Sequence, residues 1–295
     1  MVLIGSQWFG GGAAVVPVVK TYESQSHAEN AGASTHTFED QDLGDAGTKK
    51  IVIAATAQTG TSGKSLSNVQ IDPGSGLVDC TELVNVKPSS WSYICSLWSI
   101  ETITAATGDV KLTADASDME WDIWVYTLTG AAVFPSVTAS DIVASSKVLS
   151  ATLDIPANGA AIGFAIFSGA AMSVGTSTWS NLTKDDDSPT NESGGNIYII
   201  GSSASDVFTS AQSALAITDT ANSTASINDS NGCAMALASW GPTSTTEGSA
   251  TFTEVVSSGS NASSYTFSSA DIGTAGATRV VVLYVNVWTD GTSAV

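Results

Sequence analysis

The chain has 295 residues, of which 43% are hydrophobic and only 13% are charged, against about a quarter charged in a typical soluble protein. Its formal net charge of -19 would repel the phosphates of a nucleic acid. The apolar run at residues 13–19 is much shorter than the roughly 20 residues of a membrane span, and no basic residues precede it as in a signal peptide. We therefore expect neither nucleic-acid binding nor a membrane span.

Residues 1–33 are Gly-rich and irregular, which predicts an N-terminal arm outside the folded core. Four apolar side chains on this arm would otherwise be left in water: Leu3, Ile4, Trp8 and Phe9. Two interpretations stay open. The arm is a disordered terminus, or it docks through these side chains onto a neighbouring subunit of a homo-oligomer.

Residues 34–242 contain short segments of β-branched and aromatic residues, separated by clusters of Gly, Asn, Asp and Ser. One short helical turn is expected around residues 207–215. The spacing predicts an all-β domain, an antiparallel two-sheet sandwich of jelly-roll type. The main predicted strands lie at residues 51–55, 67–71, 91–98, 110–113, 120–127, 148–155, 160–167, 196–200 and 233–240.

An internal repeat is the most specific feature of the sequence. Residues 37–53 align without gaps with residues 266–282, and Thr, Phe, Asp, Gly, Ala, Gly and Val recur at equivalent positions. Each copy is typical of a short strand with a buried Phe, a Gly-containing turn and an apolar core strand. Residues 250–295 are therefore predicted to begin a second, partial copy of the module. Its strands could pair with a continuation of the natural chain, with the first domain, or with another subunit by β-augmentation.

Motifs for catalysis are few. His27 and His36 are the only histidines, and His36 occupies the position of Tyr265 in the repeat, which favours aromatic packing over a Ser-His-Asp site. Four acids between residues 115 and 122 could include the acid and base of a glycosidase, but a solvated loop is the simpler interpretation. We expect no catalytic residue.

Metal and disulfide motifs are also weak. The oxygen-rich segments 184–189 and 227–232 could hold Ca²⁺, but neither has EF-hand spacing, and turn formation accounts for their residues. Cys80, Cys95 and Cys233 are too few for a disulfide framework or a zinc site. We expect buried free thiols, with a Cys80–Cys95 bridge as the alternative, and no metal or cofactor.

Most of the eight Trp residues lie within β-like patterns and are expected in the core. Trp179 is the exception, because Ser and Thr flank it on both sides. We predict that its ring is exposed and contacts a partner or a sugar.

The repeated unit Thr-Phe-x-x-x-Asp-(Leu/Ile)-Gly-x-Ala-Gly, followed by a Val/Ile strand, resembles modules of virion proteins of tailed bacteriophages, notably marine ones. Residues 124–131, 151–159 and 232–240 are similar to the inner and closing strands of such a module. The resemblance covers about residues 34–242 and restarts at about residue 263.

This resemblance implies a non-enzymatic virion component, such as a tail fibre, a head fibre or a decoration protein. It also implies other virion proteins as partners and contact with a host-surface glycan, and it brings no catalytic residue. The competing hypothesis is a secreted carbohydrate-binding adhesin that uses Trp179.

Overall fold

A computed structural model describes residues 15–30, 33–59, 64–86, 93–115, 119–132, 135, 137–143, 146–172, 175–192, 196–222 and 233–243 of the chain. In these ranges the regular structure consists of 17 β-strands. The expected helical turn at residues 207–215 is wrong, because β15 continues to Phe208 and β16 begins at Gln212.

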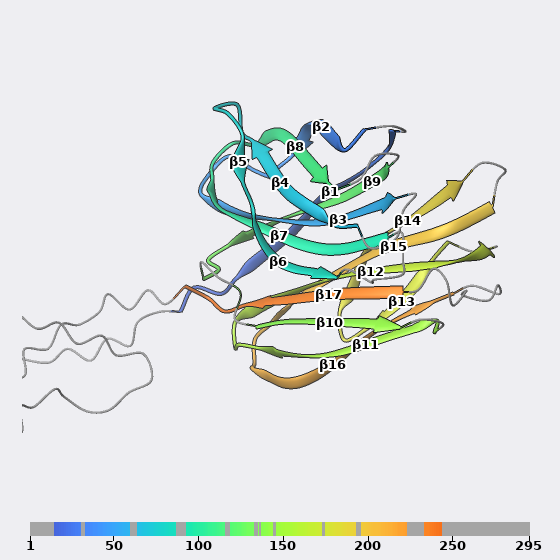
Figure 1. Cartoon of the computed structure of the whole chain (residues 1–295). Helices are drawn as coiled ribbons and strands as arrows, with labels where there is room; N and C mark the ends of the chain where they lie inside the picture. Colours follow the sequence, from blue (N-terminus) through green and yellow to red (C-terminus); the bar gives the residue numbers. More distant parts are fainter. Residues whose placement is uncertain are drawn as a thin grey trace, which may run out of the picture. The chain divides into compact units, whose positions relative to one another are not determined.

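The strands form four antiparallel sheets, which Figure 1 shows as four stacked layers. The first outer sheet has the order β2 (Thr35–Asp42), β8 (Thr107–Ala114), β4 (Leu66–Asp72) and β5 (Val78–Asp79). The first inner sheet has the order β1 (Val19–Asn30), β9 (Met119–Thr129), β3 (Lys49–Thr59), β7 (Tyr93–Ile103) and β6 (Thr81–Val86). The second inner sheet has the order β10 (Val137–Val143), β17 (Cys233–Trp240), β12 (Gly159–Met172), β15 (Asn196–Phe208) and β14 (Thr183–Glu192). The second outer sheet has the order β11 (Val148–Ile155), β16 (Gln212–Ala221) and β13 (Ser177–Ser180).

The prediction of an all-β antiparallel sandwich is confirmed, but there are four sheets where two were expected. The predicted domain at residues 34–242 forms, together with β1, two sandwiches. The inner strands explain the difference. All eight residues of β17 are buried, because this strand packs against sheets on both of its faces. Such a strand is a continuous apolar run, so its sequence does not reveal how many layers surround it.

The two sandwiches share one strand order. The order β1-β9-β3-β7-β6 in the first inner sheet corresponds to β10-β17-β12-β15-β14 in the second, and β2-β8-β4 corresponds to β11-β16-β13 in the outer sheets. Each set follows the same sequence of strands along the chain. The described part of the chain is therefore two tandem copies of one strand arrangement, packed through their equivalent inner sheets.

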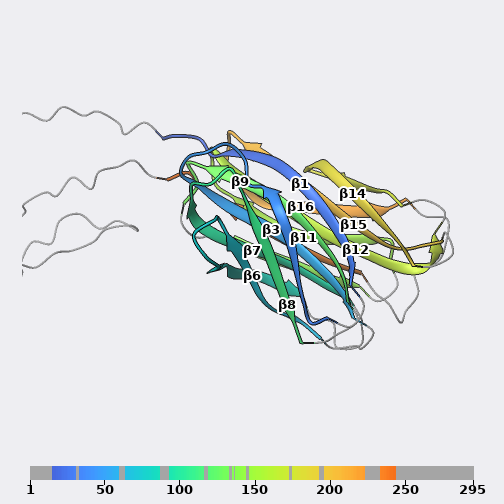
Figure 2. The same cartoon turned by 90° about the horizontal axis from the view of Figure 1, so that it is seen from above.

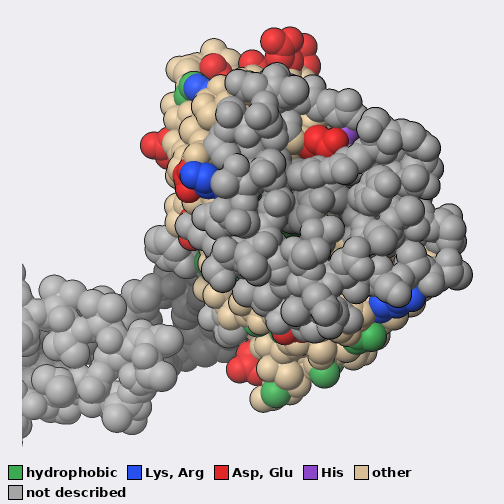
Figure 3. Space-filling model, turned by 45° about the vertical axis from the view of Figure 1, so that its right-hand side comes forward, with side chains coloured by type: hydrophobic (Ala, Val, Ile, Leu, Met, Phe, Trp, Pro, Cys, Tyr) green, Lys and Arg blue, Asp and Glu red, His purple; other side chains and the backbone are tan. Residues whose placement is uncertain are grey.

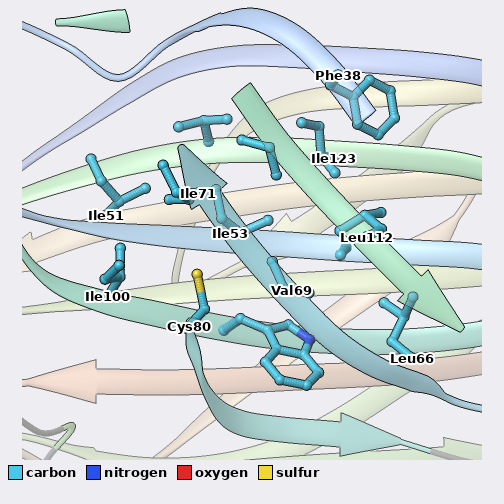
Figure 4. Packing of buried hydrophobic residues seen from close by; sticks show 14 of the residues in the cluster. Phe38, Ile51, Ile53, Leu66, Val69, Ile71, Cys80, Ile100, Leu112 and Ile123 are labelled. Atoms are coloured by element: carbon cyan, nitrogen blue, oxygen red, sulfur yellow. The ribbon is translucent and has the colours of Figure 1, made fainter. Parts of the chain in front are cut away.

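Three apolar clusters fill the spaces between the four layers. Figure 4 shows the cluster of the first sandwich, in which Phe38, Val69 and Leu112 of the outer sheet face Ile53 and Ile123 of the inner sheet. A second cluster lies between the two inner sheets, and a third fills the second sandwich. In the central inner strands β3, β9, β12 and β17, alternate residues enter different clusters, as the period of two in a strand requires.

The predicted arm at residues 1–33 is wrong for its last third. Val19–Asn30 forms β1, which pairs with β9 from Val19↔Thr129 to Asn30↔Met119. A β-bulge between Tyr22 and Ser24 interrupts this pairing. Leu3, Ile4, Trp8 and Phe9 lie outside the described residues.

The first copy of the internal repeat has the local structure that was predicted. Residues 37–53 run from β2 through a turn into β3, and Phe38 is buried. Gly44 in the turn has a φ of 78°, a conformation that favours glycine. The predicted partial copy at residues 250–295 lies outside the described residues.

Candidate functional site

A polar cluster joins the two sandwiches beside the apolar layer that they share. We call it the interface polar cluster and define it as Lys20, Tyr22, Tyr126, Asp185, Asp186 and Ser205. The first three residues come from β1 and β9 of the first sandwich, and the last three come from β14 and β15 of the second. Figure 2 shows β1 next to β14 and β15.

Asp185 is the centre of this cluster. Its carboxylate accepts hydrogen bonds from the Tyr126 hydroxyl at 3.1 Å and from the Ser205 hydroxyl, and it pairs with the Lys20 ammonium at 3.3 Å. Lys20 also donates to Ser205 at 2.7 Å. The side chains of Lys20 and Asp185 are only 19% and 10% exposed, so water screens this pair little.

The two tyrosines keep their protons and act as donors. Burial raises the pKa of Tyr22, and the carboxylates of Asp186 and Asp185 raise it further. Burial is also the main cause that raises the pKa of Tyr126, with Asp185 adding to it. Tyr22 accordingly donates to Asp186 at 3.0 Å. A deprotonated phenol would place two negative charges together in a poorly hydrated space.

A second polar group extends the contact along β1. The buried carboxylate of Asp122 in β9 lies 2.9 Å from Nδ1 of His27 and accepts hydrogen bonds from Gln25 and Ser188. Ser188 belongs to β14, so this group also links the two sandwiches. The group thereby holds β1 against β9 of its own sandwich and against β14 of the other.

This second group does not have the order of a catalytic triad. In a Ser-His-Asp triad the imidazole lies between the hydroxyl and the carboxylate. Here the Asp122 carboxylate contacts both His27 and the Ser188 hydroxyl. His36 packs edge-on against Phe38, with ring centroids 4.6 Å apart, as expected for an aromatic packing role.

The acids that raised the glycosidase alternative have separate surroundings. Asp115 is exposed and accepts a hydrogen bond from Ser65, whereas Asp122 is buried against β1 and β14. Asp118 lies outside the described residues. Asp115 and Asp122 share no hydrogen-bond partner among the described residues, and their different surroundings give no support to a shared acid and base pair.

The oxygen-rich segment 184–189 forms part of β14 and is not a turn. Asp185 and Asp186 bind the first sandwich, and Asp187 pairs with Lys184 at 2.6 Å. No group of three His, Cys, Asp or Glu side chains in the described ranges could hold a metal ion. The other segment, 227–232, lies outside those ranges.

The prediction that Trp179 is exposed is wrong. The residue is 8% exposed and its side chain packs in the core of the second sandwich, where its Nε1 donates to Ser202 at 2.8 Å. In β13 the residues alternate between buried and exposed, so Thr178 and Ser180 face out and Trp179 faces in. Trp98, Trp121, Trp124 and Trp240 are buried as well, in agreement with their predicted core positions.

Cys80, Cys95 and Cys233 are free and buried, which confirms the expected free thiols. Burial raises the pKa of the Cys80 thiol to about 12, so this group is not a nucleophile near neutral pH. The three thiols lie in three different apolar clusters.

The described surface carries acidic groups at several places. Figure 3 shows Asp and Glu side chains around the edge of one face, with a few Lys side chains among them. Among the described residues no helix has the length and apolarity to cross a bilayer. No family model, curated protein or solved structure matches the chain.

Sequence reasoning missed the interface polar cluster. Lys20 and Tyr22 were assigned to an arm, and Asp185 and Asp186 to a turn. The available signal was the spacing of Lys20 and Tyr22 two residues apart, but the bulge after Tyr22 interrupts the alternation, and the neighbouring polar residues are also common in irregular segments.

Proposed function

We propose that the chain is a non-enzymatic structural protein of a bacteriophage particle, a component of a tail fibre, a head fibre or a decoration layer. The observation that supports this proposal best is the tandem arrangement of two sandwiches with one strand order, joined through equivalent inner sheets. Repeated rigid β modules suit a protein whose task is to span a distance and to present surfaces. The resemblance of residues 34–242 to virion modules points the same way.

The strand order supports a jelly-roll assignment for each module. The first inner sheet contains β1, β9, β3 and β7, and the facing outer sheet contains β2, β8, β4 and β5. Consecutive strands β1 to β4 alternate between the two sheets, as in a jelly roll with two Greek keys. If the two sandwiches are counted as the first and second modules, residues 250–295 would begin a third.

The polar contacts support assembly and not catalysis. The buried carboxylates of Asp122 and Asp185 each bond to partners from both sandwiches or from adjacent strands. Groups tied up in this way hold two domains in register. We expect homo-oligomers and other virion proteins as partners, through surfaces outside this cluster.

The adhesin alternative has lost the residue that motivated it. A flat aromatic ring that stacks on a sugar must be exposed, and Trp179 is buried. A host-surface glycan remains a proposed partner of the particle, with no residue assigned to the contact.

Particle proteomics tests the proposal. Phage particles from a culture that carries the gene would be purified on a density gradient and digested, and peptides of this chain should migrate with those of the capsid protein. Immunogold labelling with an antibody against residues 34–242 would then show whether the chain is on the head or the tail. A chain found only as free protein in the supernatant would contradict the proposal and favour a secreted protein.

A further inference from the structure

The two sandwiches differ at one equivalent core position. Leu112 of β8 pairs with His36 of β2 and with Val69 of β4. In the second sandwich, Asp219 of β16 pairs with Leu149 of β11 and with Trp179 of β13.

The burial patterns of β8 and β16 give the same alignment. Each strand ends in three buried residues separated by partly buried ones, and Leu112 and Asp219 are the middle buried residues. Leu112 points into the apolar cluster of Figure 4. An Asp therefore occupies a position that the first sandwich fills with a Leu.

The burial of the Asp219 side chain is only weakly compensated within the described part of the chain. The residue is 0% exposed, and neither carboxylate oxygen has a hydrogen-bond partner there. The Ser177 hydroxyl and the Thr220 backbone lie close enough to favour the charged form of Asp219, but burial outweighs both. The nearby Ser177 hydroxyl donates to Ser202, at 2.7 Å. An ionised carboxylate in such a place is costly, whereas a protonated one is close to a neutral polar group.

The charged and titratable neighbours remove only a small part of this cost, through the charge of Lys184. Asp187 of β14 adds a second negative charge, and Lys184 of the same strand pairs with Asp187 at 2.6 Å. Cys233 of β17 is a buried thiol and carries no charge at neutral pH, because burial raises its pKa to about 12. The residues that pair with Asp219 from β11 and β13, Leu149 and Trp179, are not titratable.

We propose that Asp219 is a proton-dependent latch of the second sandwich: with its proton the outer sheet β11-β16-β13 stays closed on the inner sheet, and without it this sheet opens more readily. The first sandwich, which has Leu112 at the equivalent position, does not respond. The latch is independent of the proposed function.

The direction of the pH dependence follows from the difference between the closed and open states. Burial, with the Asp187 charge adding to it, raises the pKa of Asp219 to about 7, against about 3.9 for a free Asp. The closed sheet therefore binds the proton more tightly than the open one, so acid stabilises it. This stabilisation is complete below about pH 4, falls as the pH rises, and is lost above about pH 7.

Thiol labelling of the full chain tests the latch, because each sandwich carries its own buried cysteine. Cys233 lies in the cluster of the second sandwich and Cys80 in that of the first. Wild type and Asp219→Asn would be labelled with a maleimide under native conditions between pH 5 and 9, and mass spectrometry would measure each site. Comparing the two proteins at the same pH cancels the intrinsic pH dependence of the thiols.

The ratio of the Cys233 labelling rates, wild type over Asp219→Asn, should rise about tenfold per pH unit up to about pH 7 and stay constant above it. The Cys80 ratio should not change with pH. Asp219→Leu, which introduces the residue of the first sandwich, should give a Cys233 rate without this extra pH dependence and controls for a fold defect of the Asn variant.

Two results would overturn the latch. One is a Cys233 ratio that does not change with pH, or one that Cys80 follows equally. The other is protection of Cys233 by millimolar Ca²⁺ at pH 8 in wild type but not in Asp219→Asn, which would mean that the carboxylate serves a cation.

Discussion

Gly201 lies where an aromatic ring of one sandwich touches the backbone of the other. A Cβ at this position of β15 would be 2.4 Å from the ring of Trp124, which is fully buried and packs against Phe164 with ring centroids 4.7 Å apart. Because the ring is enclosed, we expect Gly201→Ala to lower the free energy of unfolding by about 1–3 kcal/mol. Urea denaturation would measure this loss.

The matched control is Thr152→Ala, a change of similar size on the exposed side of β11, which should cost little. In combination with Trp124→Phe, which shortens the ring, Gly201→Ala should cost less than it does alone. Strict additivity of the two changes would mean that the Trp124 ring is not the obstacle.

Lys50 is a buried cation held by a carboxylate. Its side chain is 3% exposed and pairs with Glu101, which is 36% exposed. Burial lowers the pKa of Lys50, and the charge of Glu101 offsets part of this shift. Glu101→Gln should therefore cost about 1–3 kcal/mol, less than the loss of a fully buried partner because Glu101 is partly in water.

The same change should alter the pH dependence of stability. Without Glu101 the pKa of Lys50 in the folded state falls further, so the unfolded state binds more protons, and stability should rise with pH until about pH 10.4. Lys50→Met/Glu101→Gln, which has no charge to titrate, should lack this rise. Denaturation curves at pH 7 and 9 would give the free energy of unfolding of each variant at both pH values. An equal change of this free energy with pH in the two variants would contradict the argument.

At the scale of single residues, the sequence predicted chemistry better than orientation. The role of His36 in aromatic packing follows from its alignment with Tyr265, and the structure places it on Phe38. The orientation of Trp179 was wrong because its neighbours suggested a wet surface. In a strand such neighbours face the opposite side, so they say nothing about the residue between them.

At the scale of elements, β1 is the test of the fold. As an arm, residues 19–30 would exchange their amide hydrogens within seconds, whereas as a strand they should be protected by their pairing with β9. Hydrogen exchange with mass spectrometry should find peptides from this strand protected to a degree similar to β6, the opposite edge of the same sheet. Rapid exchange would restore the arm interpretation.

The exposed turn at residues 73–77 gives the internal reference for this measurement. The amides of Gly74 and Gly76 donate only to the Asp72 side chain within the turn, so they should exchange faster than amides paired in a sheet. Tyr22→Phe and Lys20→Met would show how β1 is held. Each removes a contact with the second sandwich, so protection in β1 should fall while that in β3 is unchanged.

Strands with a clear apolar pattern were predictable. The predicted strands at residues 148–155 and 233–240 coincide with β11 and β17. β1 and β14 were missed because their side chains are mostly polar and bind across the interface, so their burial depends on a partner that is distant in sequence. Hydrophobic periodicity shows which side of a strand packs against an apolar core. β1 and β14 instead make polar contacts across the interface, which leave no such pattern.

At the scale of the whole molecule, the sequence revealed one repeat and concealed another. The copy at residues 266–282 is visible because it retains Phe and Gly at matching positions. The second sandwich repeats the strand order of the first, but Leu112 corresponds to Asp219 and β5 has no counterpart in it. A strand order survives many substitutions because it depends on the pattern of burial and not on particular residues.

The apolar layer between the inner sheets should make the two sandwiches unfold together. Val52, Leu97 and Trp124 of the first face Phe164 and Ile166 of the second, so loss of either sandwich exposes the other. At pH 6, where Asp219 keeps its proton and the outer sheet stays closed, we expect Cys80 and Cys233 to become reactive toward a maleimide at the same urea concentration, since each then reports unfolding of its own sandwich. Two separate midpoints would mean that the layer contributes little.

Ala54→Asp introduces a charge into this shared layer, because Ala54 of β3 is fully buried there. A charge without a partner in such a place is costly, so both midpoints should move to lower urea by a similar amount. Ala46→Asp, the same change at an exposed position, should leave both midpoints in place. If Ala54→Asp lowered only the midpoint of Cys80, the second sandwich would be stable without the first, and the shared layer would be a contact between independent domains.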